Sequence, residues 1–156
     1  MADCVLVAGI GNLFLSDDGF GPEVVRQLAQ QDDLPAGVKV VDYGIRGMHL
    51  AYDLLDGYRA LVVVDALPGA GRAGDITVLE VGQDDLGAGD FDPHGMAPVA
   101  VLASVHQLGG TLPPTYVVGC QPENVEEGIG LSEAVAAAVP QAIAAVRTLL
   151  DQRLPS

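Results

Sequence analysis

Three aspartates stand where carboxylates could take part in chemistry. Asp18 lies in the loop after the apolar run 5–8, while Asp42 and Asp65 directly follow two further apolar runs. In open α/β sheets, binding sites form beyond the carboxyl ends of the strands. We therefore expect these carboxylates at one edge of a sheet, although a single aspartate in such a position is more often a helix cap or a turn residue.

One histidine could join these acids. His94 lies in the loop 92–96, ahead of a predicted helix, whereas His49 and His106 fall inside predicted helices. Two carboxylates and an imidazole would offer oxygen and nitrogen ligands to a divalent ion such as nickel or zinc. No local spacing such as HExxH supports this set, so spacing alone indicates a metal site only weakly.

The glycines at 9 and 11 invite a different interpretation, a dinucleotide-binding loop. That fingerprint requires a third glycine where Phe14 stands. Asp17 and Asp18 would also repel a phosphate at the start of the following helix. A nucleotide site is therefore disfavoured, and the chain has no GxSxG sequence that would indicate a serine hydrolase.

Composition narrows the class of protein further. The chain has 156 residues, 49% of them apolar and 18% charged, which fits a single globular domain over residues 1–156. A net charge of −14 disfavours nucleic acid as a partner. The apolar runs are shorter than the roughly 18 residues of a membrane span, and no secretion signal is recognisable. We expect a cytoplasmic protein in which Cys4 and Cys120 are free thiols.

Apolar runs alternate with helical patterns along the chain. Strands are predicted at 5–8, 38–41, 61–64, 76–81 and 116–119, and helices from Pro22, over 48–55, over 98–108, and from Ser132, with Pro140 kinking or splitting the last one. Strands that alternate with helices predict a three-layer αβα sandwich with a mostly parallel sheet.

Several motifs, in order along the chain, resemble those of the hydrogenase maturation protease family. The opening motif is Gly9-Ile10-Gly11-Asn12-Leu13-Phe14-Leu15-Ser16-Asp17-Asp18-Gly19-Phe20-Gly21. It is followed by Leu61-Val62-Val63-Val64-Asp65-Ala66, by His94 with Leu108-Gly109-Gly110, by Val118-Gly119-Cys120-Gln121-Pro122-Glu123, and by Gly130-Leu131-Ser132. The set covers nearly the whole chain, and the opening motif is the most specific.

The resemblance implies both a fold and a site. The family fold is a twisted five-stranded sheet flanked by helices, with one antiparallel strand, here 76–81. The metal-contacting and catalytic positions carry over to Asp18, Asp65 and His94. Asp42 matches a supporting acidic position. Gly44 and Arg46 lie in a loop expected to face the substrate, where this chain departs from the glycine- and threonine-containing sequence of many members.

The resemblance also implies an activity. Such a protein is an endopeptidase that removes the C-terminal extension from the precursor of a [NiFe]-hydrogenase large subunit, after a basic residue. Nickel would be sensed in the substrate rather than held permanently, and a monomer is expected. Either the metal activates the carbonyl or water, or an aspartate acts as general base. The alternative is a non-cleaving, nickel-sensing chaperone for the same precursor.

Overall fold

The computed structural model describes residues 4–69, 71–81, 102, 104–105 and 107–153. Within them, five strands form one sheet in the order β2-β1-β3-β5-β4. Their bounds are β1 Val5–Ile10, β2 Val38–Gly44, β3 Ala60–Ala66, β4 Ile76–Val81 and β5 Thr115–Cys120. β2, β1, β3 and β5 pair in parallel, and β4 pairs antiparallel to β5. The mostly parallel sheet with one antiparallel edge strand, at the predicted residues, is confirmed.

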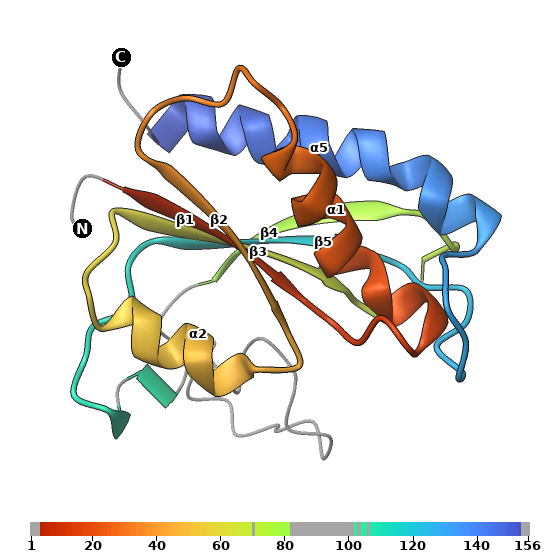
Figure 1. Cartoon of the computed structure of the whole chain (residues 1–156), viewed down its shortest axis with the longest axis horizontal. Coiled ribbons are helices and arrows are strands. Elements are labelled where there is room, and N and C mark those ends of the chain that lie inside the picture. Colours follow the sequence, from red (N-terminus) through yellow and green to blue (C-terminus); the bar gives the residue numbers. More distant parts are fainter. Residues whose placement is uncertain (1–3, 70, 82–101, 103, 106, 154–156) are drawn as a thin grey trace.

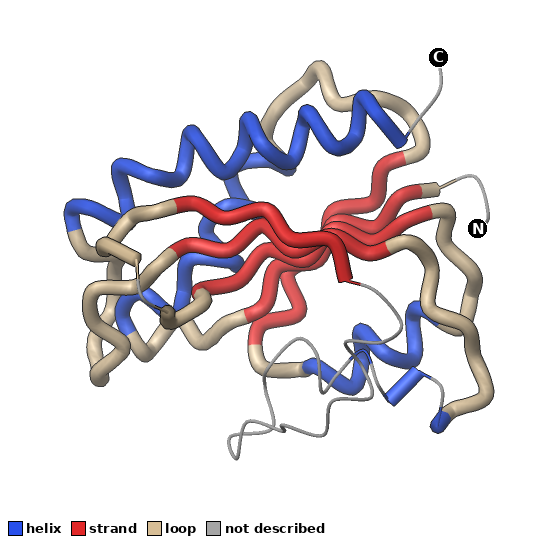
Figure 2. The backbone as a smooth tube through the Cα atoms, turned by 180° about the vertical axis from the view of Figure 1, so that it is seen from behind, coloured by secondary structure: helices blue, strands red, loops and turns tan. Residues whose placement is uncertain are grey.

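Helices cover both faces of the sheet. The short helix η1 (Ser16–Gly19) leads into α1 (Phe20–Ala29), and α1 lies with α5 (Glu133–Arg153) on one face. α2 (Gly47–Leu54) covers the opposite face (Figure 1), and the view from behind in Figure 2 shows the same three layers. The predicted three-layer αβα arrangement is therefore confirmed.

The central strands are apolar because helices shield them on both sides. Every residue of β1, β3 and β5 is buried. Val62 and Val64 belong to the core cluster shared with α1 and α5, whereas Leu61 and Val63 belong to the cluster shared with α2. A strand buried on both faces has a continuous run of apolar residues, and the sequence therefore predicted these strands.

Two glycines bring η1 and α1 against the carboxyl ends of the strands. A Cβ at Gly21 would lie 2.3 Å from the carbonyl oxygen of Val64 and 2.4 Å from that of Ile10. A Cβ at Gly11, whose φ is +150°, would lie 1.9 Å from the carbonyl oxygen of Asp18. Only glycine permits such close backbone contact, so these positions fix Asp18 at the sheet edge.

Four of the five strands extend further than predicted, and two of these, β2 and β3, carry the aspartates. β2 continues to Gly44, so Asp42 lies inside the strand, and β3 continues to Ala66, so Asp65 is its penultimate residue. The extension of β3 follows from its partner, because Asp65 pairs with Gly119 and Ala66 with Cys120. Both aspartates nevertheless remain at the carboxyl edge, as expected.

Pro140 does not split the last helix. α5 continues from Glu133 to Arg153 with the proline inside it. The proline removes an N–H that would otherwise bond the carbonyl of Ala136, and both residues are exposed to solvent. Water can serve that carbonyl there, so the split is the wrong alternative of the two predicted, and a kink at Pro140 stays a prediction.

α5 is also long and apolar enough, by length and composition alone, to cross a membrane. Its inward residues belong to the core cluster shared with the sheet and α1; they include Val135, Val139, Ala142, Val146 and Leu150. The core helix of a soluble protein meets the same criteria. Its packing in the cluster indicates a core element.

The predicted helix at 98–108 is only partly described. Residues 102, 104, 105 and 107 are helical, and Leu102 and Val105 are buried in the core cluster shared with α2. The rest of that prediction lies outside the described residues.

Candidate active site

Asp65 is a buried carboxylate at the carboxyl edge of the sheet. Asp65 is only 6% exposed, and its Oδ1 accepts a hydrogen bond from the backbone N–H of Ala66 at 2.8 Å. Burial raises the pKa of Asp65 well above 3.8, the negative charge of Asp18 raises it further, and the Ala66 N–H lowers it. Asp65 therefore holds a proton far more readily than an exposed aspartate does.

Asp18 is the neighbour whose charge acts on Asp65. It lies in η1, is partly buried, and its Oδ2 accepts a hydrogen bond from the backbone N–H of Asn12 at 2.8 Å. The fold thus brings together two carboxylates that are 47 residues apart in the sequence numbering. Two neighbouring carboxylates are stabilised by a shared proton or by a bound cation. This pair is therefore suited to provide two of the ligands of a metal ion.

A third ligand is not found within the described residues. Among them, no group of three histidine, cysteine, aspartate or glutamate side chains could hold a metal ion. His94 lies outside the described residues, so its place at the site stays a prediction. His49 lies in α2, as the predicted helix over 48–55 requires, and it is exposed. The described part of the chain therefore contains the two carboxylates of the expected set, and their binding of a metal stays a prediction.

The loop 42–46, which was predicted to support the site, makes several of its hydrogen bonds within itself. Exposed Asp42 accepts a hydrogen bond at Oδ1 from the N–H of Gly44, whose φ is +56°. Arg46 donates from Nη2 to the carbonyl oxygen of Asp42 at 3.0 Å. The carbonyl of Gly44 accepts from the N–H of Gly11 at 3.0 Å, which ties this loop to the end of β1. A direct role for Asp42, Gly44 and Arg46 in substrate contact stays a prediction.

Asp17 is the important residue that the sequence did not reveal. It is fully buried and accepts hydrogen bonds from the N–H groups of Glu123 (2.9 Å), Asn124 (3.1 Å) and Ser132 (2.7 Å), and from the Ser132 hydroxyl (2.8 Å). Burial raises the pKa of Asp17, but these donors together outweigh it, so the pKa lies below 3.8. Its donors are more than 100 residues away, so no local spacing could signal them.

Asp17 joins two segments that we call the paired loops, residues 12–19 and 121–132. The N–H of Ser16 donates to the carbonyl of Gly128 at 2.8 Å, and the N–H of Gly128 donates to the carbonyl of Phe14 at 2.9 Å. Ser16 has a φ of +52°, which a non-glycine residue adopts only when its surroundings impose it. The bonds between the paired loops thus fix the backbone just before Asp18.

The geometry defines a doubly covered α/β protein whose carboxyl edge carries an acidic pair. Comparison with known proteins identifies its family. The model of the family described as hydrogenase maturation protease matches residues 22–149. The chain belongs to the hydrogenase maturation protease family, and it is therefore a peptidase.

Individual relatives agree with this assignment. The chain is 36% identical to the hydrogenase expression/formation protein HupD of Rhodobacter capsulatus, over 93% of the chain and 70% of HupD. It is 32% identical to the hydrogenase 2 maturation protease of Escherichia coli, over 97% of the chain and 95% of that protein. The solved structure of the hydrogenase maturating endopeptidase HybD from E. coli matches with a TM-score of 0.82 at 28% identity, covering 96% of this chain and 93% of HybD.

The family and the peptidase class expected from the sequence motifs are confirmed. A family of proteases argues against the alternative of a non-cleaving chaperone, and it also argues against a nucleotide-dependent enzyme.

Proposed function

We propose that this protein removes the C-terminal extension from the nickel-loaded precursor of a [NiFe]-hydrogenase large subunit. Family membership supports the peptidase activity and the substrate class. The observation that carries the chemistry is the pairing of Asp18 with buried Asp65 at one edge of the sheet. We further propose that the protein works in the cytoplasm as a monomer that meets its precursor transiently.

In this proposal nickel arrives as part of the substrate. Asp18 and Asp65 provide two oxygen ligands, and His94 provides a nitrogen ligand, a combination that suits a borderline divalent ion. A dipositive ion near Asp65 offsets the charge of Asp18 and favours loss of the Asp65 proton. The precursor without nickel leaves the two acids unneutralised, so the site discriminates between loaded and empty precursor.

Two routes for the hydrolysis fit this site. In one, the substrate's nickel acts as a Lewis acid toward the scissile carbonyl or the attacking water. In the other, a carboxylate of the pair removes a proton from water while nickel only positions the peptide. The raised pKa of Asp65 supports the second route, because a general base is most effective when its pKa approaches the working pH.

The experiment is a mass measurement on intact precursor. Nickel-loaded and nickel-free large subunit are each incubated with the protein, and loss of the short C-terminal fragment is expected only from the loaded form. Asp18→Ala, Asp65→Ala and His94→Ala should each lower the rate by about 10³-fold or more. Asp32→Ala, at an exposed turn after α1, is the matched control and should cleave at the parent rate.

Each result has a definite meaning. Cleavage of nickel-free precursor at the same rate would contradict nickel sensing. Processing by His94→Ala at the parent rate would remove the histidine from the site. Binding of precursor without any mass loss would contradict the peptidase role and favour the chaperone alternative.

A further inference from the structure

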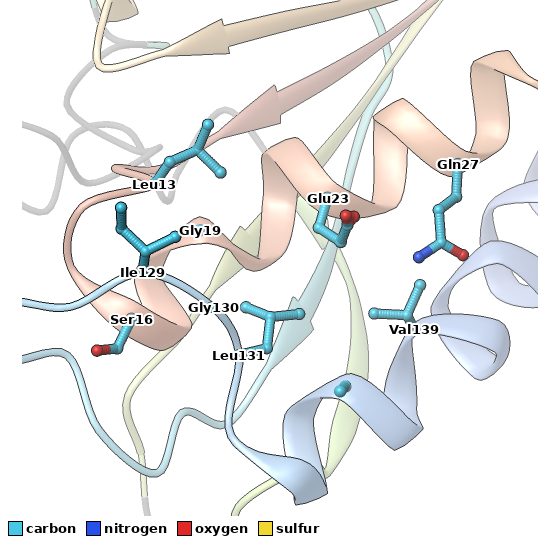
Figure 3. Close-up of a pocket in the computed structure, with 10 residues that line it drawn as sticks. Leu13, Ser16, Gly19, Glu23, Gln27, Ile129, Gly130, Leu131 and Val139 are labelled. Atoms are coloured by element: carbon cyan, nitrogen blue, oxygen red, sulfur yellow. The ribbon is translucent and has the colours of Figure 1, made fainter.

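An apolar groove of about 390 Å³ lies between the paired loops, α1 and the start of α5. Figure 3 shows Leu13 and Ile129 at one end, Leu131 between the loops and α5, and Gln27 and Val139 at the other end. The groove therefore crosses the outer side of the α1 and α5 layer. It begins at the loop that carries Asp18.

Large apolar side chains are exposed at the groove and next to it. Leu13 and Ile129, which line the groove, are 52% and 82% exposed, and Phe14, which follows Leu13 in the chain, is 68% exposed. Clustered apolar exposure of this kind typically marks an interaction surface on a soluble protein, because it is costly to leave in water.

The backbone under these side chains is fixed. Phe14 donates its N–H to Asn12 Oδ1 at 2.9 Å and accepts from the N–H of Gly128. Gly128 also forms a β-bridge with Leu15 and accepts from the N–H of Ser16. A fixed apolar surface loses little conformational entropy when a partner binds. The surface is therefore already arranged for docking.

The groove begins beside the proposed active site. Ser16 and Gly19 line it, and they lie in η1 on either side of Asp18 in the sequence. A chain seated in the groove is therefore bound next to the helix that carries Asp18. This proximity favours the substrate of that site as the occupant.

The charges around the groove indicate what kind of segment fits. Glu23 lies on its wall, Glu126 and Glu127 lie on the exposed loop next to Ile129, and Glu133 begins α5. One cation, Arg26, is paired with Glu23 at 2.7 Å. An apolar floor with an acidic border complements an apolar segment that carries basic residues at its sides.

We propose that this groove, together with Leu13, Phe14 and Ile129, docks an apolar segment of the precursor large subunit that is flanked by basic residues. Docking there holds the precursor while its C-terminal end reaches the Asp18–Asp65 pair. This inference rests on the proposed function and deepens it, because it assigns a recognition surface outside the nickel-sensing residues.

The test is a kinetic comparison of two matched aspartate substitutions. Ile129→Asp places a charge at the mouth of the groove, and Leu79→Asp places one on β4, at a residue that is 47% exposed and does not line the groove. Because both parent side chains are exposed, both variants should fold. Ile129→Asp should raise KM for nickel-loaded precursor about tenfold or more, which corresponds to ~1.4 kcal/mol, and change kcat less than about threefold. Leu79→Asp should leave both constants at the parent values.

A second pair of measurements tests the charge of the segment. KM of the parent should rise with salt concentration, because screening weakens attraction between the acidic border and a basic segment. Glu126→Gln combined with Glu127→Gln should raise KM at low salt and reduce that salt dependence. A parent KM that does not respond to salt would overturn the assignment of basic flanks.

The remaining outcomes separate this inference from the proposed function. Cleavage by Ile129→Asp with the parent KM overturns the docking site while the peptidase role stands. If the parent binds precursor but does not cleave it, the proposed function fails, and the docking site stands only if Ile129→Asp loses that binding. A parent that forms dimers which Ile129→Asp dissociates would show that a second copy fills the groove, and this also overturns the inference.

Discussion

Asp17 and Asp65 are two buried carboxylates with opposite properties. Asp17 is fully buried and Asp65 is 6% exposed, yet the pKa of Asp17 is lowered and that of Asp65 is raised. Burial raises both. The difference is that Asp17 accepts four hydrogen bonds, whereas Asp65 accepts one from a backbone N–H and faces the negative charge of Asp18.

The comparison separates an anchor from a reactive group. A buried carboxylate surrounded by donors is stabilised as an anion, and it cross-links the segments that supply those donors. A buried carboxylate beside another acid is destabilised as an anion, and a proton or a cation relieves it. Asp17 therefore joins the paired loops, while Asp65, in our proposal, is the group that responds to what enters the site.

The largest expected change in the free energy of unfolding comes from replacing Asp17. Asp17→Asn keeps the size of the side chain but replaces one acceptor oxygen by an NH₂ group that faces donors. We expect the free energy of unfolding to fall by about 3 kcal/mol, because buried donors lose their partner. Urea denaturation measures this, with Asp32→Asn as the exposed control.

An unchanged free energy of unfolding in Asp17→Asn would mean that the hydrogen bonds to Asp17 contribute little, and the contrast with Asp65 would then lose its physical basis.

The parent should also lose stability in acid. Since the folded-state pKa of Asp17 is lowered, its contribution is present above the unfolded pKa of about 3.8 and disappears as the pH falls through the folded value.

A smaller effect is expected at one donor. Ser132→Ala removes the hydroxyl that bonds Asp17 Oδ2 but keeps the N–H that bonds Oδ1. We expect a loss of about 1.5 kcal/mol, the usual value for a hydrogen bond to a charged group. Ser132→Thr, which retains a hydroxyl, should recover most of the loss in thermal melts. Equal melting temperatures for Ser132→Ala and the parent would contradict this account.

The fold was predictable because its signals are local. The buried strands are continuous apolar runs, and the exposed edge strand 76–81 could be placed as antiparallel from the family resemblance. Asp18 and Asp65 could be proposed as a pair because strands that run in parallel end at one edge. The split expected as one alternative at Pro140 is wrong because the proline lies on the exposed side of α5, a position that depends on tertiary packing.

The anchor was not predictable because its partners are distant. Asp17 stands next to Asp18 in the sequence, and both looked like acids in one loop. Ser132 was interpreted as the cap of α5, and it does precede Glu133, but its hydroxyl donates to Asp17. Adjacent residues of one type can face opposite environments, and only the folded chain shows which one meets the donors.

The smallest expected change in the free energy of unfolding has the opposite sign. Asp65→Asn removes the group whose ionisation the folded state opposes, so it should stabilise the protein by about 1 kcal/mol near neutral pH, as functional-site substitutions often do. It should also abolish processing of precursor.

The effect of Asp65→Asn on stability should depend on pH. The folded-state pKa of Asp65 is raised, so ionisation of Asp65 destabilises the parent at high pH, and the parent recovers stability as the pH falls below that pKa toward the unfolded value. The gain of Asp65→Asn over the parent should therefore be largest at neutral to alkaline pH and shrink toward pH 4 in parallel melts. A gain that does not depend on pH would mean that ionisation of Asp65 is not its source, and Asp65 would then resemble Asp17 more closely than the structure indicates.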